Sequence, residues 1–352
     1  MKNLKKLLAL LTVVALLAAM TACGDSTASA DTAASASEAA AQSAAEPANE
    51  APAADETASG NSYNVGICQL VQHDALDAAT QGFKDALTEK LGDKVSFDEQ
   101  NASGDSANCA TIINGFVSSN VDLILANATA PLQAAAAATS EIPVLGTSVT
   151  DYATALEIDN WTGTVGTNVS GTSDLAPLEQ QAAMIKELFP DAKKVGLLYC
   201  SAEPNSVYQC DVMEEALKAD GYEVTRYTFT DTNDVTPVTE SACAESDVIY
   251  IPTDNTAASN TEAIANVVLP AKVPVVAGEE GICSGCGVAT LSISYYDIGY
   301  KSGEMAYDIL VNGADIKTMP VEFAPEVTKK YNAANCEALE LTMPEDYVAI
   351  EG

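Results

Sequence analysis

YNVGICQLVQHDALDAATQGFKDALTEKLGDKVSFDEQ, residues 63–100, contains the pattern of a strand, a helix and a second strand. The β-branched and apolar residues 63–71 predict a buried strand. Residues 74–91 predict a helix, because their apolar side chains recur at intervals of three and four. The residues that share this face are Leu76, Ala79, Phe83, Leu87 and Leu91. Residues 95–100 return to a strand pattern, so the segment predicts two parallel strands joined by a covering helix.

The same alternation continues along most of the chain. Further strands are predicted at residues 121–126, 142–146, 194–200, 222–229, 247–252 and 273–278. Helices are predicted at residues 105–119, from Pro131 onward, and at 176–189, 205–219, 236–244, 256–267 and 296–312. Repeated β-α units call for parallel sheets with helices on both faces. Two runs of similar size therefore predict an α/β fold with two doubly wound parallel-sheet lobes joined by a hinge.

The order of these elements predicts how the chain is divided between the lobes. Residues 62–170 are expected to form lobe one and residues 171–295 lobe two. The last long helix is expected to return to lobe one with roughly 296–318, and roughly 319–352 to lobe two. The apolar runs after the N-terminal segment have the length of buried strands, so no second transmembrane candidate is predicted.

The N-terminal segment, residues 1–22, has the layout of a secretory signal peptide. A basic start precedes an apolar run that ends at Met20 and is too short to span a bilayer as a stable helix. The small residues before Cys23 resemble the lipobox of bacterial lipoproteins, although Met20 stands where leucine is preferred. The resemblance implies lipidation of Cys23, with the protein extracytoplasmic and lipid-anchored to the cell membrane. Residues 23–61, rich in Ala, Ser and Glu, are expected to be a disordered linker.

The charge composition argues against binding to nucleic acids or to anionic membrane surfaces. Fifty acidic against 16 basic residues give a formal net charge of −34, which would repel the phosphates of nucleic acids and of anionic membranes. Arg226 is the only arginine, and it lies in a predicted strand away from the loops expected to form a pocket. A ligand carboxylate would therefore need backbone N–H groups at helix N-termini and Ser or Thr hydroxyls.

Eight cysteines follow Cys23, at spacings that do not describe a disulfide-dense mini-protein. Cys283 and Cys286 form a lone CxxC, which is compatible with a redox pair, half of a zinc site or a short-loop disulfide. No second CxxC and no nearby histidine supports zinc. Structural cysteines or a local bridge are therefore favoured, and no cofactor or metal is predicted.

Polar residues follow the predicted strands, at the edge where parallel sheets bind ligands. These loops are residues 69–73, 127–129 and 146–148 in lobe one and 201–206, 253–255 and 278–280 in lobe two. Helix N-termini after several of them favour an anionic group, so Thr129 and Ser206 are candidates for a ligand carboxylate. Asp254 and Glu279 are candidates for a ligand ammonium group. Ser206 and Asp254 are also good N-caps, so a purely structural role stays open for each.

His73 is the only histidine and follows the first strand, where it is either a ligand contact or a capping or surface residue. It lacks the partners for Ser-His-Asp or Cys-His catalysis. The chain also has no GxSxG, HExxH or P-loop motif. The sequence therefore does not predict an enzyme.

The loops and helices together resemble a family of ABC-importer substrate-binding lipoproteins whose members bind tryptophan, tyrosine or phenylalanine. The similar segments are VGICQLVQHDALDAATQGFKDAL (65–87), QNASGDSAN (100–108), NATAPLQAAA (127–136), VTDYATAL (149–156), SAEPNSVYQ (201–209), PTDNTAAS (252–259), SYYDIGYKSGEMAYDIL (294–310) and LTMPEDY (341–347). The resemblance thus covers residues 63–347, and QxxxHxALD, ExNS and PTDN together are fairly specific to the family. It implies a type I periplasmic-binding fold, with two lobes and several strands crossing at the hinge.

The resemblance also implies a set of ligand-binding residues. Carried over position by position, they are Gln69, His73, Thr129, Thr147, Ser148, Glu203, Asn205, Ser206, Asp254 and Asn255. Glu279 joins them from the strand ends. The chain departs from the family pattern at Tyr152, which replaces a proline, and at the Cys283–Cys286 insert.

The implied function is that of an extracellular solute-binding lipoprotein of an ABC importer, which closes around a small molecule and docks on a membrane permease. The ligand is expected to be an aromatic or related hydrophobic amino acid, with Tyr152 or Tyr296 as its wall. The expected partners are this ligand, the ABC permease subunits and the membrane, and the protein is expected to be a monomer that binds no nucleic acid. A sensor module, or a binding protein for nucleosides or sugars, stays an alternative.

Overall fold

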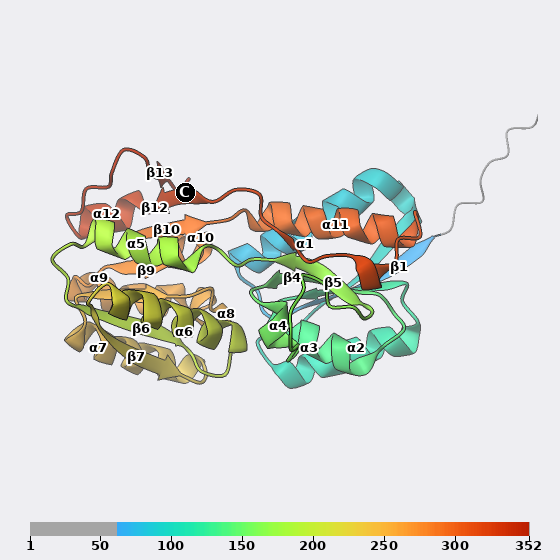
Figure 1. The fold of residues 1–352 in the computed structure, drawn as a ribbon, viewed down its shortest axis with the longest axis horizontal. Helices are drawn as coiled ribbons and strands as arrows, with labels where there is room; N and C mark the ends of the chain where they lie inside the picture. The colour runs from blue at the N-terminus through green and yellow to red at the C-terminus, as the bar shows by residue number, and fades with distance from the viewer. Residues whose placement is uncertain (1–61, 352) are drawn as a thin grey trace, which may run out of the picture. The chain divides into compact units, whose positions relative to one another are not determined.

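The computed structural model describes residues 62–351, whose strands form a six-stranded and a seven-stranded sheet (Figure 1). The predicted signal peptide, Cys23 and the linker lie outside these residues. Each sheet is covered by helices on both faces, so the predicted α/β fold with two doubly wound lobes is confirmed. We call the six-stranded sheet with its helices lobe one, and the seven-stranded sheet with its helices lobe two.

Lobe one has the strand order β11-β5-β4-β3-β1-β2, and all its strands are parallel. The strands are β1 (Tyr63–Gln69), β2 (Val95–Asn101), β3 (Leu123–Asn127), β4 (Val144–Val149), β5 (Val169–Ser173) and β11 (Glu322–Phe323). The helices are α1 (Asp74–Leu91), α2 (Ser106–Ser119), α3 (Thr129–Ala138), α4 (Tyr152–Ala155) and α11 (Tyr295–Leu310). Apolar side chains of β1, β3 and β4 pack against α1 and α11 on one face and against α2, α3 and α4 on the other.

Lobe two has the strand order β13-β12-β10-β9-β8-β6-β7, in which β12 runs antiparallel to β10. The strands are β6 (Lys194–Cys200), β7 (Glu223–Phe229), β8 (Val248–Ile251), β9 (Val275–Ala277), β10 (Ala289–Ser292), β12 (Thr328–Tyr331) and β13 (Val348–Ala349). The helices are α5 (Leu178–Leu188), α6 (Pro204–Ala219), α7 (Val235–Glu245), α8 (Asn255–Ala258), α9 (Thr261–Ala271), α10 (Glu280–Gly285) and α12 (Ala333–Ala338). One face of the sheet packs against α5, α6 and α12, and the other against α7 to α10.

Three segments pass between the lobes. Residues 174–177 connect β5 to α5, residues 293–294 connect β10 to α11, and residues 324–327 connect β11 to β12. We call these the crossing segments. Because β11 pairs with β5, residues 322–323 belong to the sheet of lobe one, whereas the sequence placed them in lobe two. Lobe two likewise begins after β5 rather than at residue 171.

The predicted helix at 256–267 is wrong as a single helix, because it is divided into α8 and α9. The side-chain amide of Asn260 donates a hydrogen bond of 2.7 Å to the carbonyl oxygen of Thr256. Such a local side-chain bond competes with continuation of the helix. The helix predicted from Pro131 begins two residues earlier, at Thr129.

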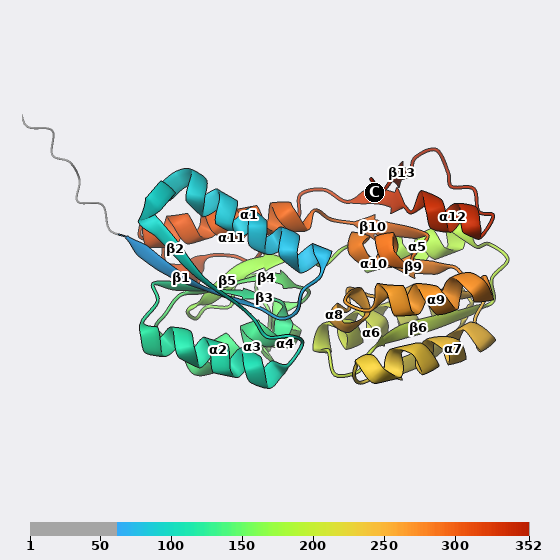
Figure 2. The ribbon, with the colours of Figure 1, turned by 180° about the vertical axis from the view of Figure 1, so that it is seen from behind.

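Helices α1 and α11 lie side by side over the sheet of lobe one (Figure 2). Glycines allow the two backbones to approach closely. A Cβ atom on Gly82 would overlap the carbonyl oxygen of Tyr296, and a Cβ atom on Gly299 would overlap that of Ala79. Since α11 begins directly after a crossing segment, this contact fixes that end of the hinge to lobe one.

We predict that Gly299→Ala lowers the free energy of unfolding by about 3 kcal/mol, because the added methyl group pushes the two helices apart. The matched control is Gly115→Ala in α2, where a Cβ atom would meet nothing within 4 Å. This control should stabilise the protein by about 0.5 to 1 kcal/mol through helix propensity. Urea unfolding of both variants measures the difference. Equal changes in the two variants would contradict the close packing of α1 on α11.

Candidate functional site

Polar residues from both lobes surround a cavity at the carboxyl ends of the parallel strands. The strand order reverses between β1 and β3 in lobe one and between β6 and β8 in lobe two, and ligands bind at such switch points. The cavity has a volume of about 10 Å³, which is room for about one water molecule. We call it the interlobe cavity.

Six of the residues predicted from the sequence line the interlobe cavity: His73, Ser148, Asn205, Asp254, Asn255 and Glu279. Five further residues complete its lining: Leu76, Asp174, Thr253, Ala258 and Tyr295. The other five predicted residues do not line it: Gln69, Thr129, Thr147, Glu203 and Ser206.

Gln69 and Thr147 make hydrogen bonds inside lobe one. The Gln69 amide nitrogen donates to Asp77 at 2.6 Å, and its amide oxygen accepts from the Thr80 hydroxyl at 2.7 Å. These bonds hold the start of α1 against the end of β1. The Thr147 hydroxyl accepts from Thr172 at 3.0 Å. Thr129 is buried in the first turn of α3.

Glu203 precedes α6, and its carboxylate accepts hydrogen bonds from the first backbone N–H groups of another helix, α8. Its Oε2 accepts from the backbone N–H of Asn255 at 2.9 Å, and its Oε1 accepts from that of Thr256 at 2.9 Å. The side chains of Asn255 and Thr256 donate to the same carboxylate. Glu203 therefore fixes the position of Asn255, whose side-chain oxygen lies 3.3 Å from Nε2 of His73 in the other lobe.

Both carboxylate oxygens of Asp254 also accept hydrogen bonds from backbone N–H groups. Its Oδ2 accepts from the N–H of Cys200 at 2.7 Å, and its Oδ1 accepts from that of Ala257 at 2.8 Å. Burial raises the pKa of this carboxyl group, and the nearby charge of Glu203 raises it further. The hydroxyl of Ser206 also bonds to Asp254 and opposes the rise. Asp254 is thus the N-cap of α8, a structural role that the sequence left open, whereas Ser206 lies inside the first turn of α6 and is not its N-cap.

Glu279 caps α10. Its Oε1 accepts from the N–H of Ile282 at 2.5 Å, and its Oε2 accepts from that of Gly281 at 2.6 Å. Complete burial raises its pKa to about 7, against the partly opposing effect of these two hydrogen bonds. Both residues expected to bind an ammonium group therefore already use their carboxylate oxygens for backbone N–H groups.

Three side-chain hydrogen bonds join the lobes next to the cavity. Besides the pair of His73 and Asn255, the hydroxyls of Thr150 and Thr253 are 3.4 Å apart. Gln209 in α6 donates to Thr253 at 2.5 Å and to Thr150 at 3.4 Å. Because all these groups are buried or half-buried, the contacts hold the two lobes against each other.

Three buried polar atoms at the cavity have no hydrogen-bond partner among the described residues. They are Nδ1 of His73, Oγ of Ser148 and Oδ1 of Asp174. Ser148 also has φ of 55°, in the left-handed region that a non-glycine residue rarely adopts. Unpaired buried polar groups are costly, and strained residues concentrate at functional sites. These atoms are therefore the part of the cavity that is available to a ligand.

Burial lowers the pKa of His73 from its ordinary value, although its hydrogen bond to the side-chain oxygen of Asn255 and the nearby acidic residues oppose the shift. The imidazole is therefore held mainly neutral. If Nε2 donates to Asn255, Nδ1 is left as an acceptor that faces the cavity.

Sequence analysis did not identify Asp174 and Tyr295. Asp174 directly follows β5, and the sequence predicts no strand at residues 169–173, so Asp174 was not expected at a strand end. Tyr295 begins α11, and the sequence selected its neighbour Tyr296 instead. Tyr296 is 40 % exposed and donates to Asp85 at 3.0 Å, so it points away from the cavity. Tyr152 is buried inside lobe one, and its hydroxyl donates to the carbonyl oxygen of Thr172 at 3.0 Å.

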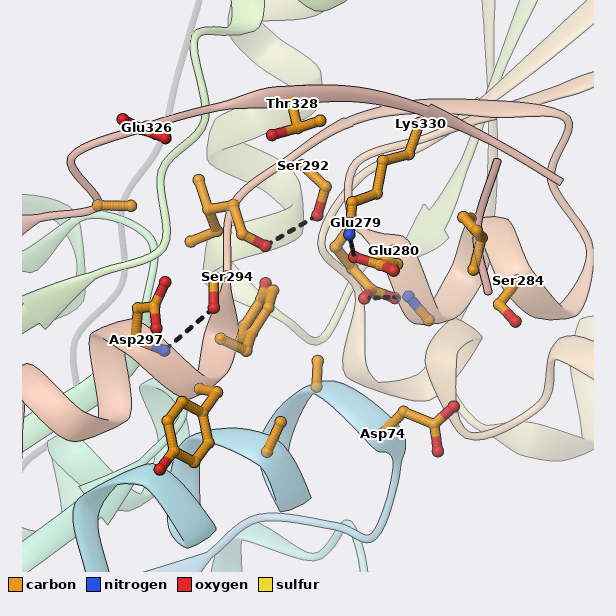
Figure 3. Close-up of a pocket in the computed structure, with 18 of the residues that line it drawn as sticks. Asp74, Glu279, Glu280, Ser284, Ser292, Ser294, Asp297, Glu326, Thr328 and Lys330 are labelled. Carbon is orange, nitrogen blue, oxygen red and sulfur yellow. Dashed lines mark hydrogen bonds and ion pairs between the residues drawn. The ribbon is translucent and has the colours of Figure 1, made fainter. Parts of the chain in front are cut away.

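A second cavity, of about 640 Å³, lies beside the crossing segments and shares Glu279 and Tyr295 with the first (Figure 3). Most of the charged residues in its lining are acidic. The labelled carboxylates are Asp74, Glu279, Glu280, Asp297 and Glu326. Lys330 is the basic residue in this lining and pairs with Glu280 at 2.5 Å.

The CxxC cysteines are buried thiols, with Cys283 in α10 and Cys286 at the C-cap of this helix. Burial raises the pKa of both thiols, so the thiolate needed for redox chemistry or zinc binding is disfavoured. Among residues 62–351, no cluster of His, Cys, Asp or Glu side chains has the arrangement of a metal site.

Arg226 lies in β7 and pairs with Asp211 at 2.8 Å and with Glu214. It does not line the interlobe cavity, so a ligand carboxylate there meets no arginine. Within the same described residues, no helix has the length and apolarity needed to cross a bilayer.

We predict that the ligand-free protein loses stability as the pH rises, in part because of Glu279. Its folded-state pKa is raised, so the associated stability is complete below about pH 4.5 and is lost as the pH rises through about 7. The difference between 4.5 and about 7 corresponds to about 3 kcal/mol at most. Melting temperatures between pH 5 and 8 should therefore fall less in Glu279→Gln than in the wild type. Glu141→Gln, which removes an exposed carboxylate, is the control and should melt like the wild type. A pH profile unchanged in Glu279→Gln would contradict the raised pKa.

Comparison with known proteins agrees with this architecture. Residues 64–350 match the family model described as ABC transporter substrate binding protein. The chain is 36% identical over 288 residues to a tyrosine-binding protein of Clostridioides difficile (strain R20291), covering 81% of this chain and 83% of that protein.

Two solved structures show the same fold in different states. One is an ABC domain from Streptococcus pneumoniae in complex with L-Trp, with 30% identity, a TM-score of 0.77, and coverage of 81% of this chain and 97% of that one. The other is the ligand-free, open structure of a substrate-binding protein with adhesive properties from Clostridium difficile. It has 35% identity and a TM-score of 0.63, and covers 82% of this chain and 99% of that one. The structure thus overlays better on the L-Trp complex than on the open form, although the sequence is more similar to the latter.

These relatives are binding proteins rather than enzymes, as the sequence predicts. The match spans the whole described part of the chain apart from a few terminal residues, and it includes both lobes and all three crossing segments. The resemblance noted from the motifs is therefore confirmed, and the chain belongs to the family of ABC transporter substrate-binding proteins.

Proposed function

We propose that this substrate-binding protein captures an aromatic amino acid between its lobes and delivers it to a membrane permease. The similarity to a tyrosine-binding protein and to a protein in complex with L-Trp supports this ligand class. The observation from the chain itself is the set of unpaired polar atoms on His73, Ser148 and Asp174, which converge on one cavity.

The chemistry of these atoms suits the main-chain groups of an amino acid. A carboxylate oxygen accepts from an ammonium group, and a serine hydroxyl donates to a carboxylate. The neutral ring nitrogen of His73 adds a second acceptor. Because the lining of the cavity contains no lysine or arginine, the ligand carboxylate would be bound by the Ser148 hydroxyl and backbone N–H groups.

The lining also has an apolar part, formed by Leu76, Ala258 and the ring of Tyr295. A cavity of about 10 Å³ cannot hold an aromatic amino acid, so the lobes must separate to admit it. The hydrogen bonds that join Thr150 of lobe one to Thr253 and Gln209 of lobe two would break in that motion. Rotation about the three crossing segments is the hinge movement that such a fold provides.

A thermal-shift screen of the purified protein tests the ligand class. We predict that L-tryptophan, L-tyrosine or L-phenylalanine raises the melting temperature by several degrees, because a ligand at 100 times its Kd stabilises the folded state by about 2.7 kcal/mol. Glycine is the matched control, since it has the same ammonium and carboxylate groups but no ring, and it should give little shift.

Uridine and glucose represent the alternative ligand classes in the same screen. A shift with either of them and with none of the aromatic amino acids would overturn the proposed ligand while leaving the substrate-binding family intact.

Attachment to the membrane through Cys23 and delivery to the permease form the second part of the proposal, and they rest on the N-terminal sequence and the family. We predict that Cys23→Ser moves the protein from the membrane fraction to the soluble fraction and reduces uptake of the labelled aromatic amino acid. Cys243→Ser, at a half-buried cysteine in α7, is the control and should change neither. Membrane retention of Cys23→Ser would rule out the lipid anchor, and uptake that is normal in cells without the protein would favour a sensor.

A further inference from the structure

We propose that Asp174 is the residue that binds the α-ammonium group of the ligand, and that Tyr295 positions it. The assignment rests on the proposed function, and it replaces Asp254 and Glu279 as the expected ammonium site. It implies that the site takes amino acids with a free α-ammonium group and discriminates against analogues that lack one.

Asp174 is the acid at the interlobe cavity that has a free carboxylate oxygen. It is 4 % exposed, its Oδ2 accepts from the Tyr295 hydroxyl at 2.8 Å, and its Oδ1 has no hydrogen-bond partner among the described residues. A cation at this oxygen would form a charge-assisted hydrogen bond in a desolvated place, where such bonds are strong.

The other acids near the cavity are excluded by their contacts. Asp254 and Glu279 each use both oxygens for backbone N–H groups at the starts of α8 and α10. Glu203 uses both of its oxygens at the start of α8. An ammonium group at any of these would share its oxygen with donors that are already bound there, whereas at Asp174 it would pair an atom that has no partner among the described residues.

Burial raises the pKa of Asp174, and the hydrogen bond from Tyr295 partly opposes the rise. No lysine, arginine or histidine side chain bonds to this carboxyl group in the described residues, so the ligand-free site holds an acid that lacks a cation. A ligand ammonium group supplies the missing charge, which stabilises the ionised form.

The positions of Asp174 and Tyr295 connect ligand binding to the hinge. Asp174 is the first residue of one crossing segment, and Tyr295 directly follows another. Their hydrogen bond therefore joins two of the three crossing segments beside the cavity. The Tyr295 hydroxyl also decides which carboxylate oxygen is left without a partner among the described residues, because it occupies the other one.

The test is isothermal titration calorimetry of the full-length protein with two matched pairs of probes. The pairs are L-tryptophan with indole-3-propionate, and L-tyrosine with 3-(4-hydroxyphenyl)propionate, and each second probe keeps the ring and the carboxylate but lacks the ammonium group. We predict that the wild type binds the amino acid on the order of 100-fold more tightly than its partner probe. Loss of one partner of a buried charge pair has a cost of this size.

Asp174→Asn should lose most of this discrimination, because it weakens binding of the amino acid and leaves that of the des-amino probe nearly unchanged. Glu141→Gln, which removes an exposed carboxylate outside the cavity, is the control and should keep the wild-type ratio. Tyr295→Phe should lower the ratio by about tenfold, since the carboxylate is still present but no longer oriented. A purely structural role of Tyr295 would weaken both probes equally.

Three results would overturn the assignment. The first is a wild-type protein that binds both members of a pair equally, which leaves the proposed ligand class standing. The second is an Asp174→Asn variant that keeps the wild-type ratio. The third is no binding of any aromatic amino acid, which removes the proposed ligand as well. If Asp174→Asn does not fold, the wild-type ratio and that of Tyr295→Phe still decide the question.

Discussion

The need to pair every buried polar atom determines how this site is organised. Where the two sheets meet, four carboxylates lie within or beside one small cavity, and each must be satisfied away from bulk water. Glu203, Asp254 and Glu279 are satisfied by backbone N–H groups at the starts of α8 and α10. One carboxylate oxygen of Asp174 accepts a hydrogen bond from the Tyr295 hydroxyl, and the other has no partner among the described residues. The three acids that the sequence suggested as ligand contacts therefore stabilise the starts of helices. Asp174, on a crossing segment, is left to bind the ligand.

The positions of these acids depend in turn on how rigidly each lobe is built around the crossing segments. In lobe one, glycines let α11 lie directly against α1, and the first residue of α11 is Tyr295. In lobe two, Gln209 and Asn205 of α6 hold the loop after β8 through Thr253. The moving parts are thus the crossing segments and the few hydrogen bonds that join the lobes. A ligand at Asp174 contacts the hinge itself, which explains how binding one ammonium group can favour closure.

Much of the fold was predictable from periodicity, whereas the roles of individual residues were not. Buried parallel strands with helices at 3.6-residue spacing indicate two doubly wound lobes, and the PTDN and ExNS motifs lie in loops that contribute to the lining of the interlobe cavity. Contacts decide the rest. The sequence cannot show that the carboxylate of Glu203 reaches the start of α8, about fifty residues away, or that Tyr295 rather than Tyr296 faces inward. Asp174 was not predicted as a site residue because the strand before it, β5, lies in a Gly- and Thr-rich stretch that has no clear strand pattern.

A crystal structure of the protein with L-tryptophan tests the central claim most directly, because it shows which oxygen the ammonium group contacts. The account predicts that this nitrogen lies within about 3 Å of Asp174 Oδ1, with the Tyr295 hydroxyl still on Oδ2 and the caps of α8 and α10 intact. An ammonium group bound to Asp254 or Glu279, with either helix cap displaced, would contradict it.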